Sequence, residues 1–80
     1  MRRDSQHLAA LGRLLRRYRQ EAQLTQEQLG FRTKLHPNYI SLVERGRHAI
    51  SFTALERWLD ATGVSWSEFG REVDQIRQST

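Results

Sequence analysis

The sequence predicts an all-α fold built from five short helices. Apolar residues recur at spacings of three and four along most of the chain, as they do on the buried face of a helix. Capping-box pairs, in which Thr or Ser is followed three residues later by Gln or Glu, mark expected helix starts at Thr25, Thr53 and Ser65. No stretch alternates apolar and polar residues as a half-buried strand does, so no sheet is expected.

The first helix is expected over residues 5–22, after a polar arm, residues 1–6, that frays at the terminus. Its buried face is a helical stripe of Leu8, Leu11, Leu15, Tyr18 and Ala22. Arg19 lies beside this stripe, and Glu44 lies late in a following helix. Because a partly buried Arg–carboxylate pair can fix the angle between two helices, we expect Arg19 and Glu44 to form a structural ion pair.

Residues 25–47 are expected to form two short helices joined by a tight turn. Thr25 and Gln28 cap the first of them, and Pro37 suits the first position of the second because proline fixes φ and lacks an N–H. Gly46 is placed to end the second helix. Such a pair is a helix-turn-helix. The pattern alone leaves open whether it binds DNA or is an ordinary helix pair in a small bundle.

A fourth helix, capped by Ser51 or Thr53, is expected to end near residue 62 and to bury Phe52, Leu55, Trp58 and Leu59. A fifth helix begins at Ser65, and its apolar stripe is Trp66, Phe69, Val73 and Ile76. The start of that stripe is expected in the core. Val73 and Ile76, toward its end, are candidates either for the core or for a dimer face.

Length and composition set the broad class. Eighty residues predict a single domain, residues 1–80, with a core over about 8–73. The chain has no cysteine, which excludes disulfides and thiol chemistry, and it has no apolar run of membrane-spanning length. We therefore expect a cytoplasmic protein without contact to a membrane. A core this small gains from dimerisation.

The charge is unevenly distributed. Residues 1–50 contain ten Lys or Arg against four Asp or Glu, whereas residues 51–80 contain three against five. Twelve of the thirteen cations are Arg, which favours forked contacts with phosphate. Arg-rich helices also occur as solvated faces, and this reading is favoured for Arg13, Arg16 and Arg17. The basic front half suits a polyanionic partner.

An enzyme is not expected. His7, His36 and His48 lie on different elements and do not have the spacing of metal ligands. No serine has a histidine and an acid placed to activate it, and no Gly-rich loop is present to bind a phosphate. The sequence therefore predicts neither a catalytic site nor a cofactor.

Four separated motifs occur in order over about three quarters of the chain. They are Leu15-x-x-Tyr18-Arg19, Leu24-Thr25-Gln26-x-x-Leu29, Tyr39-Ile40-Ser41-x-Val43-Glu44-Arg45-Gly46, and Gly63-Val64-Ser65 with Phe69. With these motifs the chain resembles the phage-repressor (Cro/XRE) type of helix-turn-helix DNA-binding family. The resemblance implies a compact five-helix, λ-repressor-like domain whose third helix, residues 37–45, lies in the major groove.

The resemblance also implies roles for individual residues. Gln26 would bind a phosphate and brace the recognition helix, while Arg45 and Arg47 would hold phosphates. Positions facing base edges are occupied by Pro37, Asn38 and Leu42. The full set expected at DNA is Thr25, Gln26, His36, Pro37, Asn38, Tyr39, Leu42, Arg45 and Arg47.

Side-chain chemistry refines these roles. Asn38 can pair bidentately with adenine, whereas Pro37 and Leu42 can only make apolar contacts, for example with a thymine methyl. His36 is expected to cap the helix or to touch phosphate, and the hydroxyl of Tyr39 to reach a phosphate or a base edge. Because Asn38 is the one side chain here that can form strong hydrogen bonds to a base, much of the specificity is expected to come from DNA shape and dimer spacing.

The chain departs from the family pattern at several positions. Lys34 and Gln23 stand where glycine is frequent, so the turns there are expected to differ locally, since a positive φ would be costly. Phe31 replaces a charged, exposed residue and is a candidate surface contact. Thr62 stands where the family usually has an aliphatic core residue, and Ile50 stands where it frequently has proline.

These observations predict a sequence-specific regulator that binds double-stranded DNA as a homodimer and is associated with the nucleoid when bound. One alternative is an antitoxin-type module that also holds a toxin or another regulator, through Phe31 or the acidic back half. Another is an architectural DNA binder without sequence preference.

Overall fold

The computed structural model describes the backbone of residues 2–79 and the side chains of residues 4–79. Within this part of the chain the structure has no strand and five helices: α1 (Arg2–Glu21), α2 (Gln26–Thr33), α3 (Pro37–Glu44), α4 (Phe52–Thr62) and α5 (Trp66–Gln78). The predicted all-α fold is confirmed. The predicted polar arm is wrong from residue 2 onward, because α1 already includes those residues. Asp4 in its first turn favours the helix through the helix dipole.

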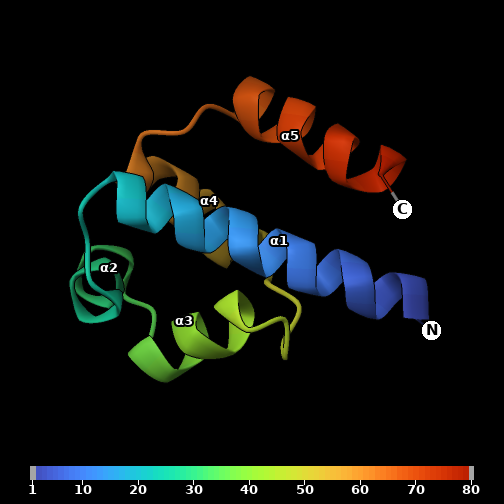
Figure 1. The fold of residues 1–80 in the computed structure, drawn as a ribbon. Helices are drawn as coiled ribbons and strands as arrows, with labels where there is room; N and C mark the ends of the chain where they lie inside the picture. Colours follow the sequence, from blue (N-terminus) through green and yellow to red (C-terminus); the bar gives the residue numbers. More distant parts are fainter. Residues whose placement is uncertain (1, 80) are drawn as a thin grey trace.

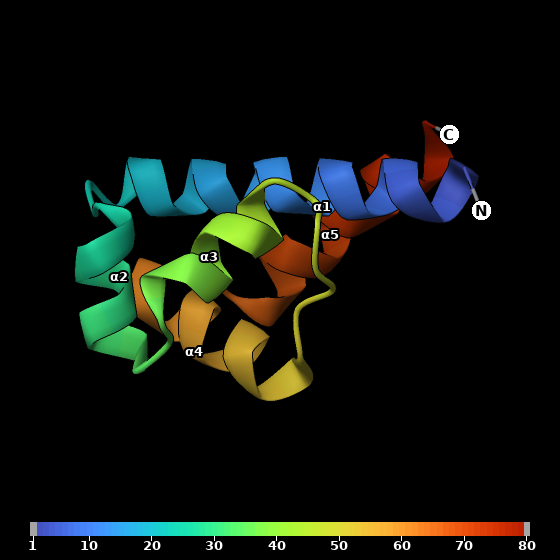
Figure 2. The same ribbon diagram turned by 90° about the horizontal axis from the view of Figure 1, so that it is seen from below.

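The helices are arranged around α1, which is the longest. Figure 1 shows α2 and α3 on one side of α1 and α5 on the opposite side. Helix α3 packs on α1 and on α2, and Figure 2, which shows the molecule after a 90° turn, has α3 in front of the other helices. Helix α3 therefore has one remaining side that faces solvent.

The core is formed where α1, α2, α3 and α4 meet. The largest fully buried side chains are Trp58, Tyr18, Leu15, Leu29, Ile40 and Leu59. The indole N–H of Trp58 donates to the carbonyl oxygen of Leu15 at 3.1 Å, so this large side chain is buried without leaving its polar atom unpaired. This single hydrogen bond joins α4 to the middle of α1.

Two aromatic residues that the sequence placed in the core lie on the surface instead. Phe52 is 69% exposed and Trp66 is 44% exposed. The buried face of α4 is centred on Ala54 and Trp58, and Phe52 lies two residues before Ala54, about 200° around the helix. Of the two residues considered as caps, Ser51 is the one that caps α4: its hydroxyl oxygen accepts from the N–H of Ala54 at 3.1 Å. This start of the helix fixes which side of α4 faces the core.

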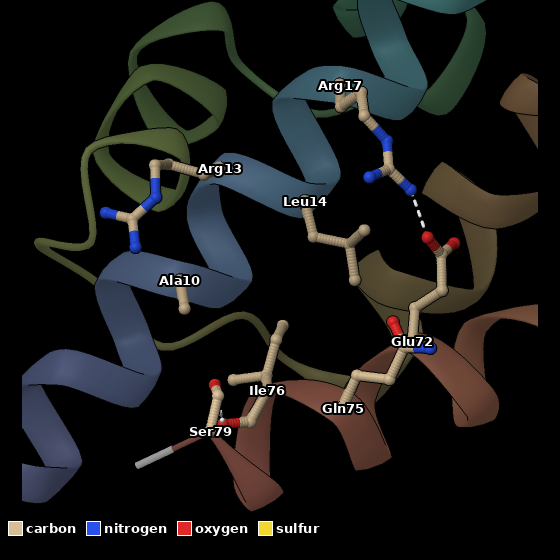
Figure 3. A pocket seen from close by; sticks show the side chains of 8 residues that line it. All are labelled: Ala10, Arg13, Leu14, Arg17, Glu72, Gln75, Ile76 and Ser79. Carbon is tan, nitrogen blue, oxygen red and sulfur yellow. Dashed lines mark hydrogen bonds and ion pairs between the residues drawn. The ribbon is translucent and has the colours of Figure 1, made fainter.

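Helix α5 is held against α1 by a polar contact that the sequence did not indicate. The hydroxyl of Tyr18 donates to Oε1 of Glu72 at 2.5 Å, and the guanidinium of Arg17 donates to the other oxygen of Glu72. Figure 3 shows Arg17 reaching from α1 to Glu72 on α5, while Ile76 is directed toward α1 between Ala10 and Leu14. We call the contact of Arg17 and Tyr18 with Glu72 the α5 latch.

The latch shifts the protonation of its members. The hydrogen bond from Tyr18, assisted by Arg17, lowers the pKa of Glu72 below its ordinary value. Burial, together with the adjacent carboxylate, raises the pKa of Tyr18. Glu72 is therefore held in its charged form, and the latch is closed at neutral pH.

The latch predicts a pH dependence of stability. Because the pKa of Glu72 is lower in the folded chain, its contribution is complete above the unfolded-state pKa, about 4.3, and is lost as pH falls through the folded value. Glu72→Gln should lower the free energy of unfolding at pH 7, and its difference from wild type should shrink as the pH falls below the unfolded-state pKa and through the lower folded-state pKa of Glu72. Urea titrations over this range measure the difference. Glu56→Gln, on the exposed face of α4, is the control, and a pH-independent difference for Glu72→Gln would contradict the prediction.

Both turns that lack the expected glycine keep the left-handed backbone conformation. Gln23 and Lys34 each have φ of 61°. The expectation that the turns would differ locally is therefore wrong. The surrounding hydrogen bonds impose the conformation: after α1, the N–H of Leu24 donates to the carbonyl of Arg19 at 3.1 Å. At both turns a residue with a side chain adopts the left-handed conformation, although this costs free energy relative to glycine.

This tolerated strain predicts a stabilising substitution. Gln23→Gly should raise the free energy of unfolding by about 0.5–1 kcal/mol, because removing Cβ relieves the left-handed penalty by more than the added entropy of the unfolded chain. Gln20→Gly, at an exposed helical position of α1, should lower it by a similar amount. Thermal or urea unfolding distinguishes the two, and equal destabilisation by both would refute the account.

Candidate nucleic-acid interface

The turn between α2 and α3 is tight because of a glycine and a left-handed residue. A Cβ on Gly30 would lie 2.6 Å from the carbonyl oxygen of Leu35, so only glycine lets the turn fold back against α2. Lys34 provides the left-handed cap of α2. Beyond Leu35, the nearest neighbour of Gly30 is the ring of Pro37, the first residue of α3. These contacts define the helix-turn-helix geometry of α2 and α3.

A buried ion pair joins α1 to the end of α3. Arg19 Nε donates to Glu44 Oε2 at 2.6 Å, and its terminal nitrogen NH2 donates to Oε1 at 2.9 Å, which makes the pair bidentate. The remaining terminal nitrogen of Arg19 donates to the carbonyl of Leu24 at 2.9 Å. Both side chains are buried. The two charges are thus paired, and each nitrogen of the Arg19 guanidinium and each oxygen of the Glu44 carboxylate takes part in a hydrogen bond, as burial requires.

Helix α2 also donates a hydrogen bond to the Glu44 carboxylate. Gln26 Nε2 donates to Glu44 Oε1 at 3.1 Å, so Glu44 receives hydrogen bonds from α1 and from α2 while it belongs to α3. Gln26 is held in place by the capping box, in which Thr25 Oγ1 accepts from the N–H of Gln28 and Gln28 Oε1 accepts from the N–H of Thr25. The Glu44 carboxylate therefore sets the relative positions of three helices.

A second glycine, which sequence reasoning missed, permits the close crossing of α1 and α3. A Cβ on Gly12 would lie 2.5 Å from the carbonyl oxygen of Val43 and 2.6 Å from that of Glu44. One turn earlier, Ala9 faces Gly46, whose φ is +72°. Gly12 directly follows Leu11 of the expected buried stripe. A glycine at such a place in a helix can indicate that another backbone approaches closely, and this was the sequence signal for the crossing.

The ion pair predicts an asymmetric response to substitution. Arg19→Ala alone should destabilise the fold by about 3–5 kcal/mol, because it leaves the Glu44 carboxylate buried without its main partner. Arg19→Met combined with Glu44→Leu should cost much less, since no buried charge remains. Urea unfolding of the single and double variants provides the measurement. A double variant as unstable as the single one would show that the charge itself is not the cause.

Helix α3 presents Asn38 and Leu42 outward from a fixed backbone. His36 Nδ1 accepts from the N–H of Asn38 at 3.0 Å and so caps the helix, and Pro37 occupies its first turn. The side chain of Asn38 is exposed, and Leu42, one turn further along the same side, is 38% exposed. We call Pro37, Asn38 and Leu42 the outer strip of α3.

Tyr39 supports the loop after α3 rather than lying on the outer strip. It is half-buried, and its hydroxyl accepts from the N–H of Ser51 at 3.0 Å. Its ring makes an edge contact with His48, with ring centroids 5.2 Å apart. The spacing of four residues from Tyr39 to Val43, a core residue, was the sequence signal for this inward orientation. His48 was not predicted at this position.

Arg45 and Arg47 extend from the turn that ends α3. Both side chains are exposed, and they flank Gly46 in its left-handed conformation. The N–H of Arg47 donates to the carbonyl of Leu42 at 2.9 Å, which ties this turn to the outer strip. The described structure therefore brings two exposed guanidinium groups to the end of the helix that carries Asn38 and Leu42.

Neither a cluster of metal-ligating side chains nor a membrane-spanning helix occurs in the part of the chain that the structure describes. Its residues contain no group of three or more His, Asp, Glu or Cys side chains placed to hold a metal ion. None of its helices combines the length and hydropathy needed to cross a bilayer.

Comparison with known proteins identifies one family. A family model described as a helix-turn-helix domain matches residues 10–76, which is most of the chain and includes all five helices in whole or in part. The match agrees with the resemblance to the phage-repressor type. No curated protein sequence matches the chain.

Proposed function

We propose that this chain, which belongs to the helix-turn-helix domain family, is a sequence-specific regulator of transcription that binds double-stranded DNA. The observation that carries the proposal is the position of α3. Its inner side is fixed by the Glu44 carboxylate, which accepts from Arg19 and Gln26, while its outer strip faces solvent. A helix fixed in this way can enter a major groove without a large loss of conformational entropy.

The side chains around α3 divide into two roles. Asn38 reads adenine through its amide, a contact that discriminates by about 1–3 kcal/mol, while Pro37 and Leu42 contact apolar base edges. Arg45 and Arg47 hold phosphates on one side of the groove. Thr25 and Gln26 place the N–H groups of the first turn of α2 near a phosphate on the other side.

His36 and Tyr39 support this surface in the proposal. The imidazole of His36 is committed to capping α3 through Nδ1, and its remaining nitrogen is available to a nearby phosphate. The hydroxyl of Tyr39 holds the loop that carries Arg45 and Arg47. These two residues therefore influence affinity mainly by fixing the contacts of their neighbours.

The regulator acts as a homodimer in the cytoplasm, associated with the nucleoid. Two copies would place their α3 helices in successive major grooves about 34 Å apart on one face of the duplex. An inverted-repeat operator follows from this two-fold symmetry. A binding role without catalysis fits a family whose members are typically non-enzymatic.

The test of the proposed function is selection of bound duplexes from a random pool, followed by sequencing. Enrichment of an inverted repeat with half-sites about one helical turn apart is expected. Binding that is strong at low salt but shows no enriched sequence would disprove sequence-specific recognition and favour an architectural DNA binder.

Asn38 and Arg47 make a matched pair for a mutational prediction. Asn38→Ala should relax the preference at one base pair, with a loss of about 10- to 100-fold on the selected duplex and little change on random duplex. Arg47→Ala should weaken binding to both duplexes and reduce the slope of affinity against salt by about one unit. Binding titrations at several salt concentrations measure both effects. An equal loss on both duplexes for Asn38→Ala would exclude it as a base reader.

A second role as a partner of another protein is favoured by Phe31. This residue is 88% exposed on α2, beside the proposed DNA surface. In an antitoxin-type module it would contact a toxin or another regulator. Phe31→Ala should then leave DNA binding unchanged while it abolishes co-purification of that partner.

A further inference from the structure

The cap of α3 differs in chemistry from the caps of α2, α4 and α5. Those three helices are capped by the hydroxyl groups of Thr25, Ser51 and Ser65. Helix α3 is capped by an imidazole, because His36 Nδ1 accepts from the N–H of Asn38 at 3.0 Å. A hydroxyl oxygen can accept a hydrogen bond at any pH, whereas Nδ1 accepts only while it carries no proton. Of these four caps, that of α3 alone therefore requires a neutral side chain.

The capped N–H belongs to the residue that is proposed to read adenine. Pro37 has no N–H, so Asn38 carries the first N–H of α3. While His36 Nδ1 accepts from this N–H, the backbone from which the Asn38 amide extends is held in one place. His36 thus acts on base recognition through Asn38, as a positioning residue.

Protonation of His36 reverses the interaction between the ring and the helix. Nδ1 then carries an N–H, which faces the N–H of Asn38, and two donors repel each other. The positive charge of the ring also lies at the positive end of the α3 dipole. The charged ring therefore has to leave the position of the cap.

The charged groups around the ring do not offset this repulsion. The hollow beside His36 is lined by Glu27 of α2 and by Lys34. From α4, Arg57 donates to the carbonyl of Thr33 at 3.5 Å, at the end of α2 and just before the turn. Among the described residues at this turn, one acid thus stands against two cations. They provide no excess of negative charge that would hold a charged ring against the end of the helix.

We propose that protonation of His36 lowers the ability of this protein to discriminate between DNA sequences, while binding to the phosphate backbone is kept. The inference rests on the proposed function and adds a proton as its regulator. The neutral ring caps α3 and holds Asn38 in place for its base. The charged ring leaves the cap and becomes one more cation that can contact phosphate on any sequence.

The sign of the effect distinguishes this role from a simple phosphate contact. A histidine that only touched phosphate would bind the selected duplex more tightly as it gained charge. A histidine that caps α3 loses the fixed position of Asn38 at the same step, so the affinity for the selected duplex gains less than the affinity for random duplex. Acid therefore brings the two affinities closer together.

A second acid-sensitive contact, the α5 latch, lies away from this cap. Figure 1 shows α5 on the side of α1 opposite α3. Val73 and Ile76, the candidates for a dimer face, are half-buried on α5 and pack on the core there. Protonation of Glu72 acts on the attachment of α5 and leaves the first turn of α3 in place. Glu72→Gln should therefore keep the pH profile of DNA discrimination that the wild type has.

The test measures discrimination, defined as the ratio of the affinities for the selected duplex and for random duplex of equal length. It is measured at constant ionic strength from about pH 8 to about pH 5.5. In the wild type the ratio should fall at least about threefold, within the 3- to 30-fold range that corresponds to the loss of a helix cap. Circular dichroism confirms that each protein stays helical over this range.

Three variants assign the change to the cap. His36→Asn supplies a cap that does not titrate, so its ratio should stay constant with pH. His36→Ala supplies no cap, so its ratio should be low at every pH. His48→Asn is the matched control, because the ring of His48 contacts Tyr39 rather than an N–H of the helix end, and it should keep the wild-type profile. A wild-type ratio that does not change with pH, or that falls equally in His36→Asn, would overturn the inference.

A measurement without DNA separates this inference from the proposed function. Nitrogen NMR shifts of the His36 ring should show its proton on Nε2 at about pH 8, and the amide signal of Asn38 should move as the ring takes up its second proton. A proton on Nδ1, or an Asn38 amide that does not respond, would overturn the inference whatever the DNA result. Equal binding of the wild type to selected and random duplexes at about pH 8 would instead refute the proposed function.

Discussion

The buried carboxylate of Glu44 is the contact on which the arrangement of the first three helices depends. It receives two hydrogen bonds from Arg19 on α1 and one from Gln26 on α2. Because each donor lies on a different helix, a small rotation of α3 would break at least one of these bonds. Hydrophobic packing alone tolerates such rotations more readily than bidentate hydrogen bonds do. The angle at which α3 is presented is therefore fixed mainly by polar geometry.

Glycine and proline positions make this geometry possible by allowing the backbone to come close. Gly12 lets α3 end directly against α1, and Gly30 lets the turn after α2 fold back on itself. Pro37 begins α3 where an N–H would have had no helical partner. With these approaches in place, one side of a two-turn helix is held against the protein while its other side remains available. The same short segment thus serves the core and the surface.

Much of the fold could be predicted from sequence, because caps and apolar spacing are local signals. Thr25 with Gln28, Ser65 with Glu68, and Pro37 each marked a helix start that the structure has. The predictions of buried and contacting side chains were wrong or missing where they depend on how two helices face one another. The buried side of α4 is centred on Ala54, which leaves Phe52 exposed although the sequence placed it in the core. The Tyr18–Glu72 contact joins residues 54 positions apart, and no local pattern reveals it.

The attachment of α5 has a consequence for the surface that α5 helps to form. Helix α5 packs mainly on α1 and is fastened there by the latch at Glu72. Trp66 belongs to α5, whereas its stacking partner Phe52 belongs to α4. When α5 opens locally from α1, the two rings separate and the flat apolar surface is lost, although α1 to α4 can stay folded. Protonation of the Glu72 carboxylate weakens the attachment of α5 to α1, so the fraction of molecules that present this surface falls as the pH falls.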